Sequence, residues 1–266
     1  MKRILLVADG GGKLGWGHAM RTLAVAHAIK DRANVALRWA TSTPSAIRGL
    51  DPPCPVLAYK HTGLNLDGLV EDVDAALIDL RFPLRDYGLG AWYMVDHGTG
   101  LDGTNRICPH FGAENRDWGA GSVCTGPRWM PLRREVVLGP EWSYNHKAPV
   151  LTYKLPPGTV LPNNTAGIEE IEEHARWFER SWWFAIVPPS TIAYELMAVG
   201  VPVLLVDPPH DQPKDIGQAM VDAGVADWWH TEMWVCGAYD FQAQVDAVGI
   251  DGRGADRIAD LLTEGT

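Results

Sequence analysis

Two short segments of the sequence each combine a predicted strand-to-helix turn with a titratable side chain. In the first, residues 15–24 (GWGHAMRTLA) follow an apolar run at residues 4–8 that is typical of a buried parallel strand. The glycines allow a sharp turn from strand to helix and a close approach of the backbone to a ligand. His18 falls at the start of the helix, where the helix dipole disfavours imidazolium. The segment predicts a neutral histidine able to accept a proton; a histidine that only packs or caps locally fits the same residues.

The second segment, residues 183–206, predicts a strand, a tight turn, a helix and another strand. Ser190 stands at the N-cap position, so the free N–H groups and the positive end of the helix face the preceding loop, an arrangement that binds phosphate. Glu195 follows about one and a half turns later. There its carboxylate could reach two neighbouring hydroxyls, such as those of a ribose. An ordinary capped helix with a solvated Glu195 is the alternative.

Together the two segments resemble the GT-B nucleotide-sugar enzymes, nearest the branch of the pseudaminic-acid-pathway UDP-sugar hydrolase and related glycosyltransferases. That branch opens its first domain with Gly-x-Gly-His-x-x-Arg, and its nucleotide site carries Ser-Thr-x-x-x-Glu, Gly-x-Pro and a Gln. The matching residues are Gly15, Gly17, His18, Arg21, Ser190, Thr191, Glu195, Gly200, Pro202 and Gln212. Residues 125–135 are also similar to the hydrolase branch's Gly-Pro-x-Tyr-x-x-Leu-Arg segment.

The sequence departs from the hydrolase branch at two places. Members of that branch usually carry Asp-x-Tyr at the end of a first-domain strand, where residues 79–81 are Asp-Leu-Arg. They also carry a Gly-Gly loop after the first strand of the second domain, where residues 156–158 are Pro-Pro-Gly. These departures favour transfer of the sugar to an acceptor over its hydrolysis.

The alternation of strands and helices predicts an α/β protein with parallel sheets. The resemblance implies a GT-B-like fold of two facing Rossmann-like domains with a cleft between them. Residues 1–140 would form the acceptor-side domain and residues 141–266 the nucleotide-sugar-binding domain, with the last helix crossing back onto the first domain, as it often does in GT-B enzymes. Strands are expected at residues 3–8, 35–40, 75–79, 92–95, 149–154, 183–187 and 202–206. Helices are expected at residues 17–31, 66–73, 168–180, 190–199, 214–223 and 253–263.

The resemblance implies a glycosyltransferase of GT-B type that moves a sugar from a nucleoside diphosphate, expected to be UDP, to a hydroxylated acceptor without a metal ion. His18 is the expected base and Asp96 the reserve. The predicted nucleotide-sugar-binding residues are Gly15, Gly17, Arg21, Ser190, Thr191, Glu195, Asp211 and Gln212. The acceptor-side candidates are Trp16, Asp79, His97 and Arg128. A UDP-sugar hydrolase with water as acceptor is the alternative, and its base would be the same.

The net charge of −10 is unevenly distributed. Residues 1–147 hold 17 Lys and Arg against 15 Asp and Glu, and the remainder holds 6 against 18. The basic cluster at Arg128, Arg133 and Arg134 would suit an anionic acceptor, such as a phosphorylated small molecule, a lipid or a hydroxylated base in modified DNA. Ordinary solvated charges fit the same pattern. DNA is the minority acceptor, because the whole chain is acidic and carries no recognised nucleic-acid motif.

Residues 10–15 (GGGKLG) also match the Gly-x-Gly-x-x-Gly dinucleotide fingerprint. That fingerprint needs an acidic residue at the end of the next strand, which here ends in Ala-Thr-Ser-Thr at residues 40–43. An NAD-dependent oxidoreductase is therefore the weaker alternative. No cofactor is expected beyond the nucleotide-sugar co-substrate. No metal site is expected either, because His97, Cys108 and His110 lack a regular ligand spacing.

The four cysteines form no Cys-x-x-Cys pair, which predicts reduced thiols and a cytoplasmic protein. No apolar run approaches the roughly 18 residues that a membrane helix needs. The apolar run at residues 4–8 is too short for a signal peptide.

Overall fold

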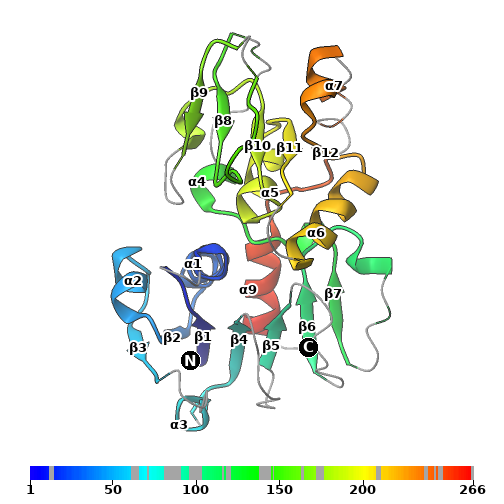
Figure 1. Cartoon of the computed structure of the whole chain (residues 1–266). Coiled ribbons are helices and arrows are strands. Elements are labelled where there is room, and N and C mark those ends of the chain that lie inside the picture. Colours follow the sequence, from blue (N-terminus) through cyan, green and yellow to red (C-terminus); the bar gives the residue numbers. More distant parts are fainter. Residues whose placement is uncertain are drawn as a thin grey trace. The chain divides into compact units, whose positions relative to one another are not determined.

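The structure is a computed structural model. It describes residues 1–11, 15–60, 66–70, 72–80, 91–95, 104–115, 117, 121–137, 145, 147–162, 165–171, 177–207, 211–236, 239–242, 244 and 248–264. The chain forms two compact units: Met1–Arg133 with Gly252–Thr266, and Arg134–Asp251 (Figure 1). The predicted ranges 1–140 and 141–266 follow chain order, so they do not include the return of the C-terminal residues to the first unit. That return matches what the resemblance implied for the last helix.

The first unit contains a seven-stranded sheet in which every neighbouring pair is parallel, in the order β3-β2-β1-β4-β5-β6-β7. Its strands are β1 (Lys2–Ala8), β2 (Val35–Thr41), β3 (Val56–Ala58), β4 (Ala75–Asp79), β5 (Ala91–Met94), β6 (Asn105–Cys108) and β7 (Val123–Thr125). The strand order reverses between β1 and β4, with Ala8 opposite Asp79 at their carboxyl ends. Such a switch point is where open α/β sheets place their ligands.

The helices of the first unit cover both faces of this sheet. They are α1 (Gly17–Lys30), α2 (Pro44–Gly49), α3 (Asp67–Val70) and α9 (Gly254–Glu264), with the short 3-10 helices η2 (Ala113–Asn115) and η3 (Pro127–Trp129). Successive residues of a strand point to opposite faces. Ile4 and Leu6 therefore join the apolar cluster under α1 and α9, whereas Leu5 and Val7 join a second cluster on the other face. Both clusters are buried, so β1 is a central strand of the unit.

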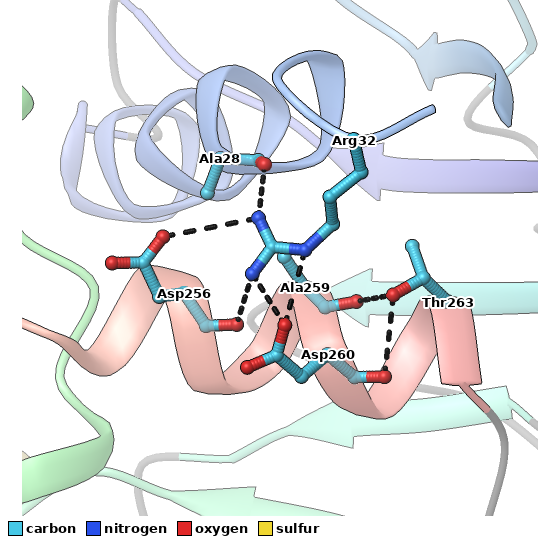
Figure 2. Close-up of polar contacts among 6 residues, drawn as sticks. All are labelled: Ala28, Arg32, Asp256, Ala259, Asp260 and Thr263. Atoms are coloured by element: carbon cyan, nitrogen blue, oxygen red, sulfur yellow. Dashed lines mark hydrogen bonds and ion pairs between the residues drawn. The ribbon is translucent and has the colours of Figure 1, made fainter. Parts of the chain in front are cut away.

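Helix α9 is fastened to α1 by apolar packing and by Arg32, which lies just after α1 (Figure 2). The Nη2 atom of Arg32 donates to Asp260 Oδ1 at 2.5 Å and to the carbonyl of Asp256 at 3.0 Å. Its Nη1 atom donates to the carbonyl of Ala28, near the end of α1. The buried face of α9 consists of Gly254, Ala255, Ile258, Ala259 and Leu262. Residues from the two ends of the chain therefore build one core.

The second unit contains a five-stranded parallel sheet in the order β12-β11-β10-β8-β9. Its strands are β8 (Val150–Thr152), β9 (Ile168–Glu170), β10 (Ala185–Val187), β11 (Val203–Leu205) and β12 (Asp227–Trp228). Its helices are α4 (Arg134–Val137), η4 (Trp177–Glu179), α5 (Thr191–Ala198), α6 (Asp211–Asp222) and α7 (Thr231–Cys236). Here the strand order reverses between β8 and β10, and the turn that leads into α5 follows β10.

The helix predicted at residues 168–180 is wrong at both of its described ends. Ile168–Glu170 forms the edge strand β9, and Trp177–Glu179 forms a 3-10 turn. The glutamates favour a helix by propensity, but pairing with β8 prevails, as in the 2.9 Å bond from the Val150 N–H to the Gly167 carbonyl. All three residues of β9 are exposed, which is why the run lacks the apolar character of the other strands.

Candidate functional site

The turn between β1 and α1 is shaped by glycines. Gly15 has a φ of +75°, a conformation that glycine adopts without strain. At Gly10 a Cβ atom would lie 2.5 Å from the Cβ atom of Ala19 and 3.3 Å from the ring of Trp16, so a side chain does not fit there. Trp16 is partly buried and packs against the apolar cluster under α1. The tryptophan predicted as an acceptor-side residue thus packs against the turn that positions His18.

His18, Asp79 and Arg21 form a hydrogen-bonded cluster at the switch point of the first sheet. The Nδ1 atom of His18 lies 2.7 Å from Asp79 Oδ1. Arg21 binds both oxygens of the same carboxylate, with Nη2 2.7 Å from Oδ1 and Nε 3.1 Å from Oδ2. His18 and Arg21 lie one turn apart on α1, and Asp79 is the last residue of β4. The sequence singled out all three residues, and the structure brings them together.

Burial and charge determine which atoms of this cluster donate hydrogen bonds. Asp79 is fully buried and the Arg21 side chain is 4% exposed, whereas the His18 side chain is 18% exposed. Because guanidinium is permanently charged, the carboxylate accepts two charge-assisted hydrogen bonds from it. The same carboxylate then accepts the Nδ1–H of His18. In this arrangement Nε2 is the nitrogen of the ring that can accept a proton.

A second polar cluster at the same edge of the sheet was not identified from the sequence. The Oδ1 atom of Asp9 accepts hydrogen bonds from Thr41 Oγ1 at 2.9 Å and from the Ser42 N–H at 2.6 Å. Its Oδ2 atom accepts one from the Tyr59 hydroxyl at 2.9 Å. Asp9 therefore links the carboxyl ends of β1, β2 and β3, which is a structural role. The sequence signal was a polar residue directly after each apolar strand.

In the second unit, α5 begins where the sequence predicted it. Ser190 is its N-cap residue, with extended backbone dihedrals of −161° and 172°, and its side chain makes no capping hydrogen bond. The Ser190 Oγ atom is buried without a hydrogen-bond partner among the described residues. Such an atom carries a desolvation cost that a bound ligand can remove. Glu195 is 3% exposed, so the alternative of a solvated Glu195 is wrong.

Other residues also lie at the carboxyl edge of the second sheet. Thr191 is the first residue of α5, and Asp211 and Gln212 are the first two of α6, which follows β11. The sequence did not single out Lys154, which follows β8 in a left-handed conformation with a φ of +45°. Its Nζ atom lies 5.3 Å from the ring of Tyr153, and burial lowers the pKa of its ammonium group. The edge therefore combines a helix N-terminus, a hydroxyl group and a cation.

The remaining predicted site residues are scattered or undescribed. Asp96 and His97 lie outside the described residues. Arg128 is exposed in η3, and its carbonyl accepts a 2.7 Å hydrogen bond from Arg257 of α9. Gly17 is the first residue of α1. Within the described ranges, no group of three or more His, Cys, Asp and Glu side chains could hold a metal ion. None of the helices described in the structure is long and apolar enough to cross a membrane.

No protein-family model matches the sequence, and no curated protein matches it. Several solved structures are nevertheless similar over nearly the whole chain. MurG from Acinetobacter baumannii is 13% identical with a TM-score of 0.61, covering 99% of this chain and 100% of that one. MnaA from S. aureus, solved with UDP, is 12% identical with a TM-score of 0.62, covering 98% and 96%. The glycotransferase of kitacinnamycin is 12% identical with a TM-score of 0.65, covering 99% and 98%. At such identities the likeness is one of fold: the chain has a GT-B-like α/β fold with two parallel-sheet domains.

Proposed function

We propose that the protein is a glycosyltransferase that moves a sugar from a nucleoside diphosphate, UDP in the first instance, to a hydroxylated acceptor. The single observation that carries the proposal is the His18–Asp79 hydrogen bond at the switch point of the first sheet. It is supported by the GT-B-like fold shared with a UDP-bound protein and a glycotransferase. The resemblance of the sequence to nucleotide-sugar enzymes points to the same class.

His18 acts as the general base in this proposal. The acceptor hydroxyl gives its proton to Nε2 of His18, and its oxygen forms a bond to the anomeric carbon of the sugar. The bond from that carbon to the diphosphate oxygen breaks, and its electron pair leaves with the diphosphate. Asp79 orients the ring through Nδ1 and stabilises the imidazolium that forms. A base in this role contributes about 10²- to 10⁴-fold to the rate. Asp96 remains the reserve candidate for the base.

The second unit binds the donor in this proposal. The first N–H groups of α5, together with Ser190 Oγ and Thr191, hold the diphosphate and stabilise its negative charge as it leaves. Lys154 adds a cation at the same edge. Glu195 binds the ribose, and Asp211 and Gln212 contact the diphosphate or the sugar. These groups carry out the charge stabilisation that a metal ion would otherwise provide, so we propose that the reaction is metal-independent.

The acceptor side belongs to the first unit, where Trp16, His97 and Arg128 are the candidate contacts. Gly15 and Gly17 remain the predicted nucleotide-sugar-binding residues of this unit, where they allow close approach of the backbone to the ligand. Water in place of the acceptor would make the protein a UDP-sugar hydrolase with the same base. The Asp-Leu-Arg sequence at residues 79–81 favours transfer over hydrolysis, because the hydrolase branch carries Asp-x-Tyr there. A phosphorylated small molecule or lipid is favoured over modified DNA as the acceptor.

The decisive experiment is a panel of UDP-sugars incubated with and without candidate acceptors, with UDP and free sugar measured by chromatography. Acceptor-dependent release of UDP is expected. Fast release of UDP and free sugar without an acceptor would establish hydrolysis instead. A calorimetric titration that found tight binding of NAD and none of any nucleoside diphosphate would favour the oxidoreductase. A salt-sensitive gel shift with hydroxymethylated DNA would favour the nucleic-acid acceptor, since phosphate contacts weaken steeply with salt.

A further inference from the structure

We infer that Arg21 is a positioning residue that keeps the Nε2 atom of His18 unprotonated, because its guanidinium neutralises the buried carboxylate of Asp79. This inference rests on the proposed function, in which Nε2 of His18 accepts the proton. It replaces the prediction that Arg21 binds the nucleotide sugar.

The geometry places Arg21 against Asp79. Its guanidinium makes two hydrogen bonds to the carboxylate, at 2.7 and 3.1 Å, and its side chain is only 4% exposed. The Nη2 and Nε atoms of this guanidinium are directed at Asp79, and a donor phosphate that took these two hydrogen bonds would leave a fully buried carboxylate without them. Such an exchange is costly, because an unpaired buried charge destabilises a protein strongly. These two hydrogen bonds favour a role for Arg21 at Asp79 over donor binding.

The charges of the cluster explain the effect of Arg21 on His18. Asp79 carries a negative charge, and Arg21 beside it carries a permanent positive charge. The Nη2 atom of Arg21 lies 3.1 Å from Nδ1 of His18, so a second proton on the ring would place two cations side by side. Among the described residues, Asp79 of β4 and Arg21 of α1 are the charged side chains that contact His18. The cluster therefore favours the neutral ring with its proton on Nδ1.

Without Arg21, the buried carboxylate would have to gain another positive partner or a proton. If His18 took the proton, both ring nitrogens would be protonated. If Asp79 took it, the carboxylic acid would donate to Nδ1 and the ring proton would move to Nε2. In either form Nε2 carries a proton and cannot accept one from a hydroxyl group. Loss of Arg21 should therefore abolish the base even though His18 itself is intact.

The test records the protonation of both ring nitrogens of His18 by ¹⁵N NMR in the ligand-free protein at pH 7. We expect the proton on Nδ1 alone in the wild type and a protonated Nε2 in Arg21→Gln. Arg21→Lys keeps the charge but not the paired hydrogen bonds, so it should restore an unprotonated Nε2 in most molecules. It also keeps the measurement possible if Arg21→Gln does not fold. Arg32→Gln is the matched control, because it removes a guanidinium just beyond the other end of α1 without a contact to His18.

Turnover of a UDP-sugar is measured in parallel. We expect Arg21→Gln to lower kcat by roughly 10²-fold, the loss expected when the base is disabled, and to leave the affinity for UDP unchanged. An Nε2 that stays unprotonated in folded Arg21→Gln, or one that is protonated in Arg21→Lys, would overturn the inference. An affinity for UDP that falls with Arg21→Gln would assign Arg21 to donor binding instead. Since the spectra need no substrate, they remain decisive if the proposed glycosyl transfer itself is not found.

Discussion

The turns that lead into α1 and into α5 each follow a strand of a parallel sheet, but their polar side chains are bonded differently. In the first unit, His18 and Arg21 near the start of α1 both bond to Asp79 at the end of β4. In the second unit, Ser190 opens α5 without a capping hydrogen bond, and its buried hydroxyl oxygen has no partner among the described residues.

In the proposed function, this contrast corresponds to different roles for the two turns: proton transfer at the first and donor binding at the second. A proton-transfer group works best when its orientation and charge are fixed before the substrate arrives. A binding site gains most when its donors become paired only on ligand binding, because the ligand then relieves their desolvation. The two units also differ in their balance of positive and negative residues. The first unit holds 17 Lys and Arg against 16 Asp and Glu, whereas the second holds 6 against 17, so the proposed donor binding would depend more on N–H groups and a few cations.

Replacing His18 by Ala should have the largest effect on activity, and it should affect proton transfer but not nucleotide binding. We expect turnover to fall by roughly 10²-fold or more, because the base is removed from an otherwise intact site. The affinity for UDP, measured by calorimetry, should stay nearly unchanged. Full turnover in His18→Ala would show that the base lies elsewhere, and Asp96, His97 and Asp79 would then be tested in the same way.

Both turns were predictable from the sequence because each is local, but their partners were not. His18 and Ser190 follow directly from a glycine turn and an N-cap. Asp79 is 61 residues from His18, and pairing it with His18 required knowing that β4 lies beside β1. Asp79 and Asp96 both follow apolar runs, so the sequence could not choose between them. Strands of two or three residues, such as β9 and β12, are too short to show a period, and the glutamates of β9 predicted a helix instead.

The cysteines of the first unit test whether its interior is tightly packed beyond the turn between β1 and α1. Burial raises the pKa of Cys54 and of Cys124 to about 11. At pH 8.5 we expect alkylation by iodoacetamide to be about 10-fold slower than for an unfolded-chain thiol, since only the thiolate reacts and its higher nucleophilicity compensates in part. Mass spectrometry in the absence and presence of denaturant measures the difference.

The same thiols predict a loss of stability at alkaline pH. The unfolded chain releases these protons near the ordinary thiol pKa of 9.0, whereas the folded chain holds them until about pH 11. Unfolding is therefore increasingly favoured as the pH rises from 9 to 11. A Cys54→Ala, Cys124→Ala double variant should lose this part of the pH dependence. Rapid alkylation of both thiols in the folded protein would contradict the assigned burial.

Ser190→Ala tests the turn before α5 directly. The hydroxyl makes no hydrogen bond within the described residues, so its removal should leave the melting temperature unchanged or slightly raised. A hydrogen bond to a charged phosphate is worth about 1.5 kcal/mol or more, so the affinity for UDP should fall about 10-fold. Ser42→Ala is the matched control, because it removes another buried hydroxyl without a described partner, in the first unit. An equal loss of affinity in both variants would contradict the assignment of diphosphate binding to α5.

Arg32→Gln should have the smallest effect and should separate the stability of the first unit from binding by the second. It removes the hydrogen bonds from Arg32 to Ala28, Asp256 and Asp260 that fasten α9 to α1. We expect a loss of about 1 kcal/mol, because these bonds are partly exposed and only some of them join charges. The melting temperature should fall by about 2–4 °C, and the affinity for UDP should not change.

Arg180→Gln is the control in the second unit, where Arg180 pairs with Glu169 through side chains that are 64% and 45% exposed. It should cost only a few tenths of a kcal/mol. If Arg180→Gln destabilised the protein as much as Arg32→Gln, the attachment of α9 would not be a distinctive support of the first unit.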